Sequence, residues 1–153
     1  MKRCHFNSWV AKTFLFPSYK AITLLYNSFF KDRRNECKPE DINHERIHQI
    51  QQIECSIVGL ILGIILWLSF DISFWWVLAP TFGFFYLWYG IEYLIILCFA
   101  KWGKQNERYH DVSFEEEAYS NEKNEDYLKG DRKLFAWFKY IKLRSYKKWK
   151  KIW

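Results

Sequence analysis

The sequence lacks the cysteine pairs that build small secreted folds and thiolate metal sites. Its four cysteines, Cys4, Cys37, Cys55 and Cys98, are scattered, and no two of them form a CxxC pair. This spacing excludes a disulfide framework and a Cys-based zinc site, so we expect reduced, structural thiols. The sequence also lacks internal repeats and low-complexity linkers. Disorder is excluded, because 22% of the 153 residues are aromatic and so many apolar rings would have to stay in water.

Basic residues are absent from one long stretch of the chain. Between Ser56 and Ala100 there is no Lys or Arg, and the only charged side chains are Asp71 and Glu92. A helix needs about 20 apolar residues to cross a bilayer, so this stretch is long enough for two crossings. We therefore expect a transmembrane helical hairpin over 56–100 that turns near Asp71. The alternative is a buried core hairpin of a soluble protein.

The charged flanks predict the orientation of this hairpin. Nine Lys and Arg precede Ser56, fourteen follow Ala100, and the turn near Asp71 has none. Because basic residues favour the cytoplasmic side, we expect a multi-pass protein of the inner or plasma membrane with both termini in the cytoplasm. No cleavable signal peptide is evident, because Lys12 interrupts the apolar run from Trp9 to Phe16.

The N-terminal flank predicts a sheet element followed by a helix. Within residues 1–38, the segment from Ala21 to Phe30 is rich in β-branched and aromatic residues, and we expect a strand that pairs with Trp9 to Phe16 as a hairpin. Residues 39–55 begin with Pro39, which suits the first turn of a helix. No helix breaker follows, so this helix is expected to continue into the apolar stretch without a break.

The C-terminal flank predicts two further helical parts. Residues 101–130 contain an acidic segment that is expected to be helical. Residues 131–153 carry nine Lys and Arg, the pattern of an amphipathic helix on the anionic inner leaflet. Its largely apolar stripe recurs at steps of three or four residues: Leu134, Phe138, Ile141, Ser145, Trp149 and Ile152. Nucleic acid is not an expected partner, because no base-reading motif accompanies the charge. The fold class is thus a mainly α membrane protein: a two-helix transmembrane hairpin with cytoplasmic helical flanks and a short N-terminal β-hairpin.

One short motif in the predicted N-terminal helix carries chemistry. His44 and His48 lie one helical turn apart on the same face, so their imidazoles can share one metal ion. Glu45 lies beside them and can accept a proton from water, which completes the HExxH arrangement of zinc metalloproteases. A catalytic zinc of this type needs a third protein ligand. The candidates are Glu115 and Glu117 in the acidic segment.

The two motifs together resemble those of the gluzincin metalloproteases, in particular the membrane-embedded CAAX-prenyl-protease type. In that family a HExxH helix is followed by a helix carrying ExxAD, whose Glu binds zinc. The resemblance implies zinc held by His44, His48 and Glu115, with Ala118 at the matching alanine and Tyr119 in place of the aspartate. The order of HExxH helix, hairpin and acidic segment also resembles that of small bacterial membrane proteins.

The substituted aspartate leaves the support of the metal ligands to other residues. Glu92, Glu117 and Glu122 are candidates to orient the ligands, and Tyr119 itself is a further candidate. Glu117 also remains an alternative third ligand, although its side chain should diverge from that of its neighbour two residues away on a helix. His110 is a candidate for transition-state stabilisation, because it is close in sequence to the acidic segment.

The expected function is zinc-dependent hydrolysis of a peptide bond at the cytoplasmic membrane interface. Glu45 would be the general base, a membrane-protein tail or peptide the substrate, and the strand within 21–30 the edge that pairs with it. Two alternatives remain. The ExxH pairs at Glu45/His48 and Glu107/His110 have the spacing of di-iron carboxylate sites, which would indicate a membrane oxidoreductase. The other alternative is a non-enzymatic membrane assembly protein with a degenerate metal site.

Overall fold

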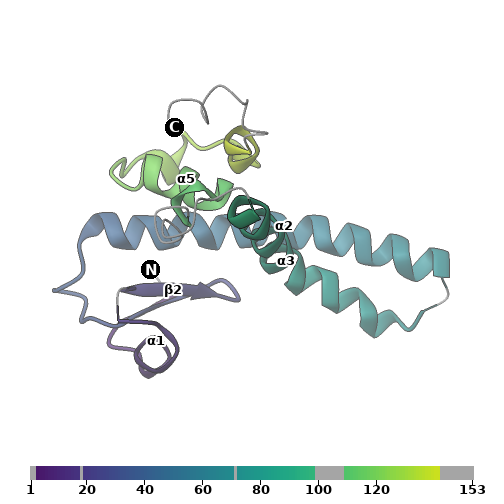
Figure 1. The fold of residues 1–153 in the computed structure, drawn as a ribbon, viewed down its shortest axis with the longest axis horizontal. Coiled ribbons are helices and arrows are strands. Elements are labelled where there is room, and N and C mark those ends of the chain that lie inside the picture. The colour runs from purple at the N-terminus through teal and green to yellow at the C-terminus, as the bar shows by residue number, and fades with distance from the viewer. Residues whose placement is uncertain (1–2, 18, 71, 99–108, 142–153) are drawn as a thin grey trace.

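Helix α2 forms the middle layer of the molecule, with a small sheet and helix α1 on one side and helix α5 on the other (Figure 1). A computed structural model describes four segments of the chain: residues 3–17, 19–70, 72–98 and 109–141. Their elements, in chain order, are β1 (Cys4–His5), α1 (Trp9–Phe14), β2 (Ala21–Leu24), β3 (Asn27–Phe30), α2 (Pro39–Phe70), the 3-10 helix η1 (Phe74–Val77), α3 (Leu78–Cys98), η2 (Tyr109–Asp111), α5 (Ser113–Asn121), η3 (Tyr127–Lys129) and η4 (Ala136–Tyr140).

Helix α2 runs without a break from the HExxH motif into the apolar stretch, as the sequence predicted. It begins at Pro39, where a missing N–H costs no helical hydrogen bond, and Glu40 and Asp41 lie near its positive end. Its 32 residues rise about 48 Å along the axis. One helix therefore carries both the candidate site and the first apolar segment.

The strand prediction for the N-terminal segment was right only in part. The stretch from Ala21 to Phe30 forms two antiparallel strands, β2 and β3, because Leu25 and Tyr26 reverse the chain with φ values of 45° and 65°. Helix α1 occupies Trp9–Phe14, so the expected pairing of Trp9 to Phe16 as a strand was wrong. The tight turn lets β3 pair with β2, which precedes it directly in the chain. Strand β1 pairs with the other edge of β3, so the strand order is β1-β3-β2.

Glutamines from α2 hold the sheet in place. Gln52 Nε2 donates to the carbonyl of Thr23, and Gln52 Oε1 accepts from the N–H of Tyr26, at 2.9 and 2.8 Å. Gln49 Nε2 donates to Ser28 Oγ at 2.7 Å. These side chains substitute for a further strand, and they fix the distance between β2 and the helix that carries the histidines.

The apolar hairpin packs through two glycines of α2. A Cβ at Gly59 would lie 2.0 Å from the carbonyl oxygen of Pro80, and one at Gly63 would lie 2.9 Å from that of Val77. These glycines let α2 and the start of α3 approach at backbone distance. By length and composition, the helices over Pro39–Phe70 and Phe74–Cys98 are both able to cross a membrane.

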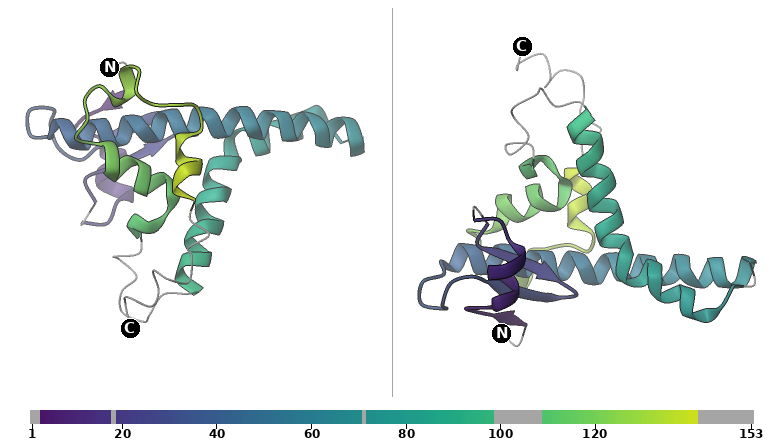
Figure 2. Two further views of the ribbon diagram at one scale, coloured as in Figure 1. Left: turned by 90° about the horizontal axis from the view of Figure 1, so that it is seen from above. Right: turned by 60° about the horizontal axis from the view of Figure 1, so that its bottom comes forward.

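Beyond this contact, α3 turns away from α2 and packs against the C-terminal part of the chain (Figure 2). Phe85 joins a buried cluster whose other members come from α2, from α5 and the residue that precedes it, and from η4: Cys55, Val112, Phe114 and Trp137. The second half of α3 therefore covers the same part of the molecule that contains the acidic segment.

The prediction of one amphipathic helix over 131–153 was wrong for its described part, residues 131–141. Only the short 3-10 helix η4 forms there, and Phe135 before it has a φ of 53°. Leu134 of the predicted apolar stripe is 81% exposed, whereas Trp137, which lies off that stripe, is 1% exposed. Residues 142–153 lie outside the described residues.

A buried carboxylate explains this path of the chain. Glu54 of α2 accepts two hydrogen bonds from the Arg132 guanidinium, at 2.6 and 2.9 Å, and a third from the N–H of Phe135 at 2.9 Å. In a continuous helix the N–H of Phe135 would donate to the backbone carbonyl four residues earlier and would not be available to Glu54. The ion pair with α2 therefore replaces the regular helix that periodicity alone favoured.

Candidate metal centre

Three predicted ligands meet between α2 and α5. His44 and His48 lie on the face of α2 that contacts α5, and Glu115 lies in the first turn of α5. The two imidazole Nε2 atoms are 3.2 Å apart. Glu115 Oε2 lies 3.4 Å from His44 Nε2, and Glu115 Oε1 lies 3.3 Å from His48 Nε2. All three residues are buried, and together they can hold a metal ion.

These separations match a tetrahedral metal site. Zinc bonds to His nitrogen and carboxylate oxygen at about 2.0–2.1 Å, which places neighbouring ligand atoms about 3.3 Å apart. The pairs formed by His44, His48 and Glu115 lie between 3.2 and 3.4 Å. The ligand atoms are therefore already spaced for one small cation.

The hydrogen bonds of the other ring nitrogens explain why both Nε2 atoms face inward as acceptors. His48 Nδ1 lies 2.7 Å from Gln51 Oε1, and His44 Nδ1 lies 3.0 Å from Glu122 Oε2. Gln51 Nε2 donates to the carbonyl of Phe114 and to Glu117, so Gln51 Oε1 can only accept. A bound metal requires both imidazoles to be neutral, and each then carries its proton on Nδ1 and directs its Nε2 lone pair into the space between the two rings.

Two tyrosines orient the carboxylate of Glu115. The hydroxyls of Tyr89 and Tyr109 both donate to Glu115 Oε1, at 3.1 and 2.6 Å. Within the described residues, Glu115 Oε2 is buried and receives no hydrogen bond. An unpaired buried carboxylate oxygen is costly, and a cation bound between it and the two histidines would remove that cost. The residues present therefore fit a bound metal ion.

The electrostatics of the group also favour positive charge. Burial alone would lower the pKa of His48, but the adjacent Glu115 carboxylate outweighs it and raises the pKa of His48 to about 9. Burial likewise opposes ionisation of Glu115, yet His48 and His44 hold its pKa well below the usual range of a carboxyl. The site is built around a negative charge that needs a cation beside it.

Glu45, the predicted general base, is held against the sheet. Its Oε2 accepts a hydrogen bond of 2.6 Å from Thr23 Oγ1, which itself lies 2.7 Å from Ser28 Oγ. Burial raises the pKa of Glu45, while the positive charge of His48 and the Thr23 hydroxyl act in the opposite direction. A carboxylate with a raised pKa is a stronger base, which suits proton transfer near neutral pH.

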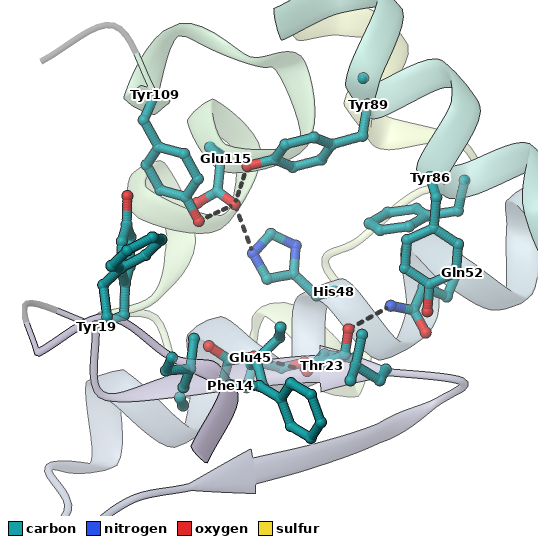
Figure 3. A pocket seen from close by; sticks show the side chains of 17 residues that line it. Phe14, Tyr19, Thr23, Glu45, His48, Gln52, Tyr86, Tyr89, Tyr109 and Glu115 are labelled. Carbon is teal, nitrogen blue, oxygen red and sulfur yellow. Dashed lines mark hydrogen bonds and ion pairs between the residues drawn. The ribbon is translucent and has the colours of Figure 1, made fainter. Parts of the chain in front are cut away.

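A cavity of about 370 Å³ opens beside these groups (Figure 3). Glu45, His48 and Glu115 supply its charged surface, and its remaining walls are mostly aromatic and aliphatic. Much of the apolar and aromatic lining comes from the end of α1, the segment after it, and α3: Phe14, Leu15, Phe16, Tyr19, Phe85, Tyr86 and Tyr89. The cavity can therefore take a large apolar group next to the metal ligands.

Strand β2 forms one wall of this cavity, and within the described part of the chain no strand pairs with its outer edge. All four of its residues line the cavity, and β2 is the outer strand of the sheet. The two-residue turn closes on Leu24 and Asn27, so the peptide groups of Ala21 and Thr23 occupy the alternate positions that point away from β3. Of these peptide groups, the Thr23 carbonyl already accepts a hydrogen bond from Gln52 Nε2. The edge remains able to pair with an extended chain.

Glu117, the alternative third ligand, points away from the histidines. Its carboxylate accepts hydrogen bonds from Arg132, Tyr127 and Gln51, and the Arg132 Nε donates at 2.7 Å. Gln51 bonds both Glu117 and His48, so two hydrogen bonds in series link Glu117 to the metal ligand His48. The structure therefore brings Glu115 to the histidines and places Glu117 behind them.

The other predicted support residues have separate positions. Glu122 bonds His44, as noted above, and the Tyr119 ring packs at 4.4 Å from the His44 ring. Glu92 of α3 accepts from the N–H and the hydroxyl of Ser113 at the start of α5. His110 is exposed and packs edge-on against Tyr119, with ring centroids 4.3 Å apart, outside the described lining of the cavity.

Several site residues could not be recognised from the motifs. Tyr89 lies in the apolar stretch, where a tyrosine indicates a membrane interface as readily as a buried hydrogen bond. Thr23 and Tyr109 lie far from HExxH in the sequence and carry no spacing signal. Gln51 offered the only usable signal, because it lies three residues after His48 and therefore on the same face of α2.

The fold and site define a class: a mainly helical protein with two helices able to cross a membrane and a buried His-His-Glu group able to hold a metal ion. Comparison of the chain with protein-family models, curated proteins and solved structures finds no match. The function must therefore be argued from the site.

Proposed function

We propose that the protein is a zinc-dependent, membrane-associated peptidase that hydrolyses a peptide bond at the cytoplasmic membrane interface. The observation that carries this proposal is the convergence of the two Nε2 atoms of His44 and His48 with the unpaired oxygen of Glu115 at the edge of a cavity. Two imidazoles and one carboxylate are a common ligand set of catalytic zinc, which leaves the fourth position for water or substrate.

The surrounding residues support roles in peptide hydrolysis. Zinc, when bound, would polarise the scissile carbonyl and lower the pKa of water. Glu45, buried and held by Thr23, would accept the proton of the attacking water and deliver it to the leaving amine. The outer edge of β2 would align the substrate backbone, and the apolar cavity would take one of its side chains.

The apolar surface supports the location. Each hairpin helix contains an apolar stretch of 18 residues that is mostly exposed: 22% of it is buried in the helix over Pro39–Phe70 and 6% in the helix over Phe74–Cys98. Nine Lys and Arg before Ser56 and fourteen after Ala100 favour the cytoplasmic side for the site and for both termini. An anionic inner leaflet would attract this charge, and tails of membrane proteins would be within reach of the cavity.

Metal analysis and product analysis of three proteins test the proposal. We expect detergent-purified wild type to hold one zinc per chain, Glu45→Gln to keep it and His44→Ala to lose it. In membranes that contain the wild type, mass spectrometry of protein N-termini should find new cleavage products that are absent with Glu45→Gln. Zinc without such products would contradict the peptidase.

The alternatives predict different metals. Two irons per chain would indicate the di-iron oxidoreductase, and absence of bound metal would indicate an assembly protein. The three described ligands include a single carboxylate, whereas di-iron sites in helical bundles use several. Glu107 of the second ExxH pair lies outside the described residues. The ligand set therefore favours zinc.

A further inference from the structure

Helix α3 changes its exposure pattern along its length. In the second half, beyond Phe85, the exposed apolar side chains follow each other at intervals of one to four residues. They are Leu87 at 62%, Ile91 at 48%, Leu94 at 61% and Ile95 at 53% exposure. At about 100° per residue these positions fall within one arc of the helix, so they form a single stripe, the lipid stripe of α3.

The opposite face of the same half-helix belongs to the protein interior. Phe85 is buried against Phe114, the Tyr89 hydroxyl donates to Glu115, and Glu92 binds the start of α5. This half of α3 is therefore one-sided, with the metal centre behind it and an apolar stripe in front.

The tip of α2 instead exposes apolar side chains on every face except the one that contacts α3. Within the described residues from Ile57 to Phe70, only Gly59 and Gly63 are buried, both against α3. The large apolar side chains exposed there include Ile57, Leu60, Ile61, Leu62, Ile64, Ile65, Leu66, Trp67, Leu68 and Phe70. A helix that is apolar all round suits immersion in hydrocarbon, whereas a one-sided helix suits the surface of a bilayer.

The directions of the two helices agree with this difference. The second half of α3 runs steeply away from the axis of α2 (Figure 2). If the axis of the α2 tip is close to the bilayer normal, the second half of α3 cannot also be parallel to that normal. It must then lie roughly parallel to the membrane plane. The same helix begins within the hairpin, where Gly59 and Gly63 bring the tip of α2 against it.

We propose that α3 is not a transmembrane helix over its whole length: from Phe85 onward it lies in the plane of the membrane interface, with the lipid stripe in the acyl region and its opposite face over the metal centre. The occupant of the stripe is the acyl chains of a bilayer, because all four stripe residues are aliphatic and the neighbouring tip of α2 exposes a large apolar surface that suits hydrocarbon. No Lys or Arg between Ser56 and Ala100 would oppose that immersion.

This arrangement sets the position of the cavity. Tyr86 and Tyr89 of the interfacial half-helix line the cavity, and a helix with its side chains is about 10 Å across. The cavity would therefore lie at headgroup level, about one helix diameter from the acyl chains. A substrate would reach the metal centre along the membrane surface and would not need to leave it.

Depth measurements with single labels test the proposal. The four native cysteines are replaced, and single cysteines at Leu87, Ile91, Leu94 and Ile95 carry a bimane label in full-length protein in vesicles of phosphatidylcholine and phosphatidylglycerol. Nitroxide lipids with the quencher high or low on the acyl chain report depth. We expect the high quencher to be the more effective at all four positions, with depths that agree within about one helical turn of 5 Å.

A reference pair on α2 calibrates the measurement. Labels at Ile57 and Leu68 are separated by about 16 Å of helical rise and should differ strongly in depth. If α3 instead crosses the bilayer, Leu87 and Ile95 differ by about 12 Å, and that gradient would overturn the proposal. Quenching of the reference pair without quenching at any of the four stripe positions would also overturn it, because a second copy of the chain or another protein would then cover the stripe.

The proposal rests on the membrane residence that forms part of the proposed function, and the reference pair separates the two failures. If neither Ile57 nor Leu68 is quenched by either lipid, membrane residence and the position of α3 both fail. If the reference pair reports a depth gradient and the stripe does too, only the position of α3 fails. The zinc content of the same samples reports the metal centre independently.

Discussion

Glu115 and Glu117 lie two residues apart on α5, and their carboxylates serve different partners. Glu115 faces His44 and His48 at 3.4 and 3.3 Å, whereas Glu117 lies 2.7 Å from the Nε of Arg132. Successive side chains on a helix diverge by about 100°, so a separation of two residues turns them to nearly opposite sides. Helix α5 thus supplies one metal ligand, Glu115. On its other side it supplies Glu117, which holds Gln51, the residue that orients His48.

This relationship predicts which acidic residue is required for metal. Glu115→Ala should abolish zinc binding, because only the two histidines remain as protein ligands. Glu117→Ala, the matched control, should keep one zinc per chain at saturating zinc while lowering stability. Metal content of purified protein by mass spectrometry measures both. If Glu117→Ala lost zinc while Glu115→Ala kept it, Glu117 and not Glu115 would be the third ligand.

Substitution of Gln51 should lower the affinity for zinc without removing a metal ligand. Its Oε1 accepts from His48 Nδ1 at 2.7 Å and so keeps the lone pair of Nε2 directed at the site. Gln51→Met should weaken zinc binding about 10- to 100-fold, as expected for loss of a partner that orients a ligand. Gln49→Met is the control, since Gln49 bonds the sheet and no histidine. Competition with a chelating dye measures both affinities, and equal values in the two variants would contradict this role.

Arg132 is predicted to be the main electrostatic support of the fold. It pairs with Glu54 and Glu117, and the side chains of all three are at most 6% exposed. Arg132→Met leaves two buried carboxylates uncompensated and should cost about 3–5 kcal/mol of stability. Lys129→Met is the control, because its pair with Asp126 is exposed to solvent and should contribute little to stability.

The Arg132 prediction can be separated from a loss of packing. Combining Arg132→Met with Glu54→Gln and Glu117→Gln removes the uncompensated charge and should recover most of the lost stability. Thermal unfolding of the detergent-purified proteins measures the wild type, Arg132→Met, Lys129→Met and the triple variant. A triple variant no more stable than Arg132→Met alone would show that shape, and not charge, is what the arginine provides.

The sequence predicted the parts of the site that local periodicity controls. His44 and His48 are four residues apart in one helix, so a helical prediction alone placed their rings together. Glu115 required a resemblance between motifs, because nothing in the periodicity of α5 relates it to α2. Thr23, Tyr89 and Tyr109 reach the site from three further segments, and such long-range contacts leave no local pattern in a single sequence.

The errors in the fold have local physical causes. The segment from Ala21 to Phe30 was taken as one strand because its turn uses Leu25 and Tyr26 at positive φ, where Asn and Gly are usual. Their N–H groups are held by Tyr86 and Gln52, two residues remote in sequence. Such bonds offset the cost of a turn that composition would not predict.

Gly59 gives the last prediction, on how the hairpin is held. With Gly63 it forms a GxxxG pair in α2, and a Cβ at this position would lie 2.0 Å from the Pro80 carbonyl oxygen, which is backbone and cannot yield. Gly59→Ala should therefore separate α2 from α3 and cost at least about 1–3 kcal/mol, the range for overpacking a close contact.

Gly83 provides the matched control for Gly59. A Cβ there would meet nothing within 4 Å, so Gly83→Ala should leave stability unchanged or raise it by up to about 1 kcal/mol through helix propensity. Because Tyr89 of α3 bonds Glu115, separation of the helices in Gly59→Ala should also weaken zinc binding, while Gly83→Ala keeps it. Thermal unfolding and zinc competition measure the pair, and equal behaviour of the two variants would mean that the glycine contact neither holds the hairpin nor supports the metal centre.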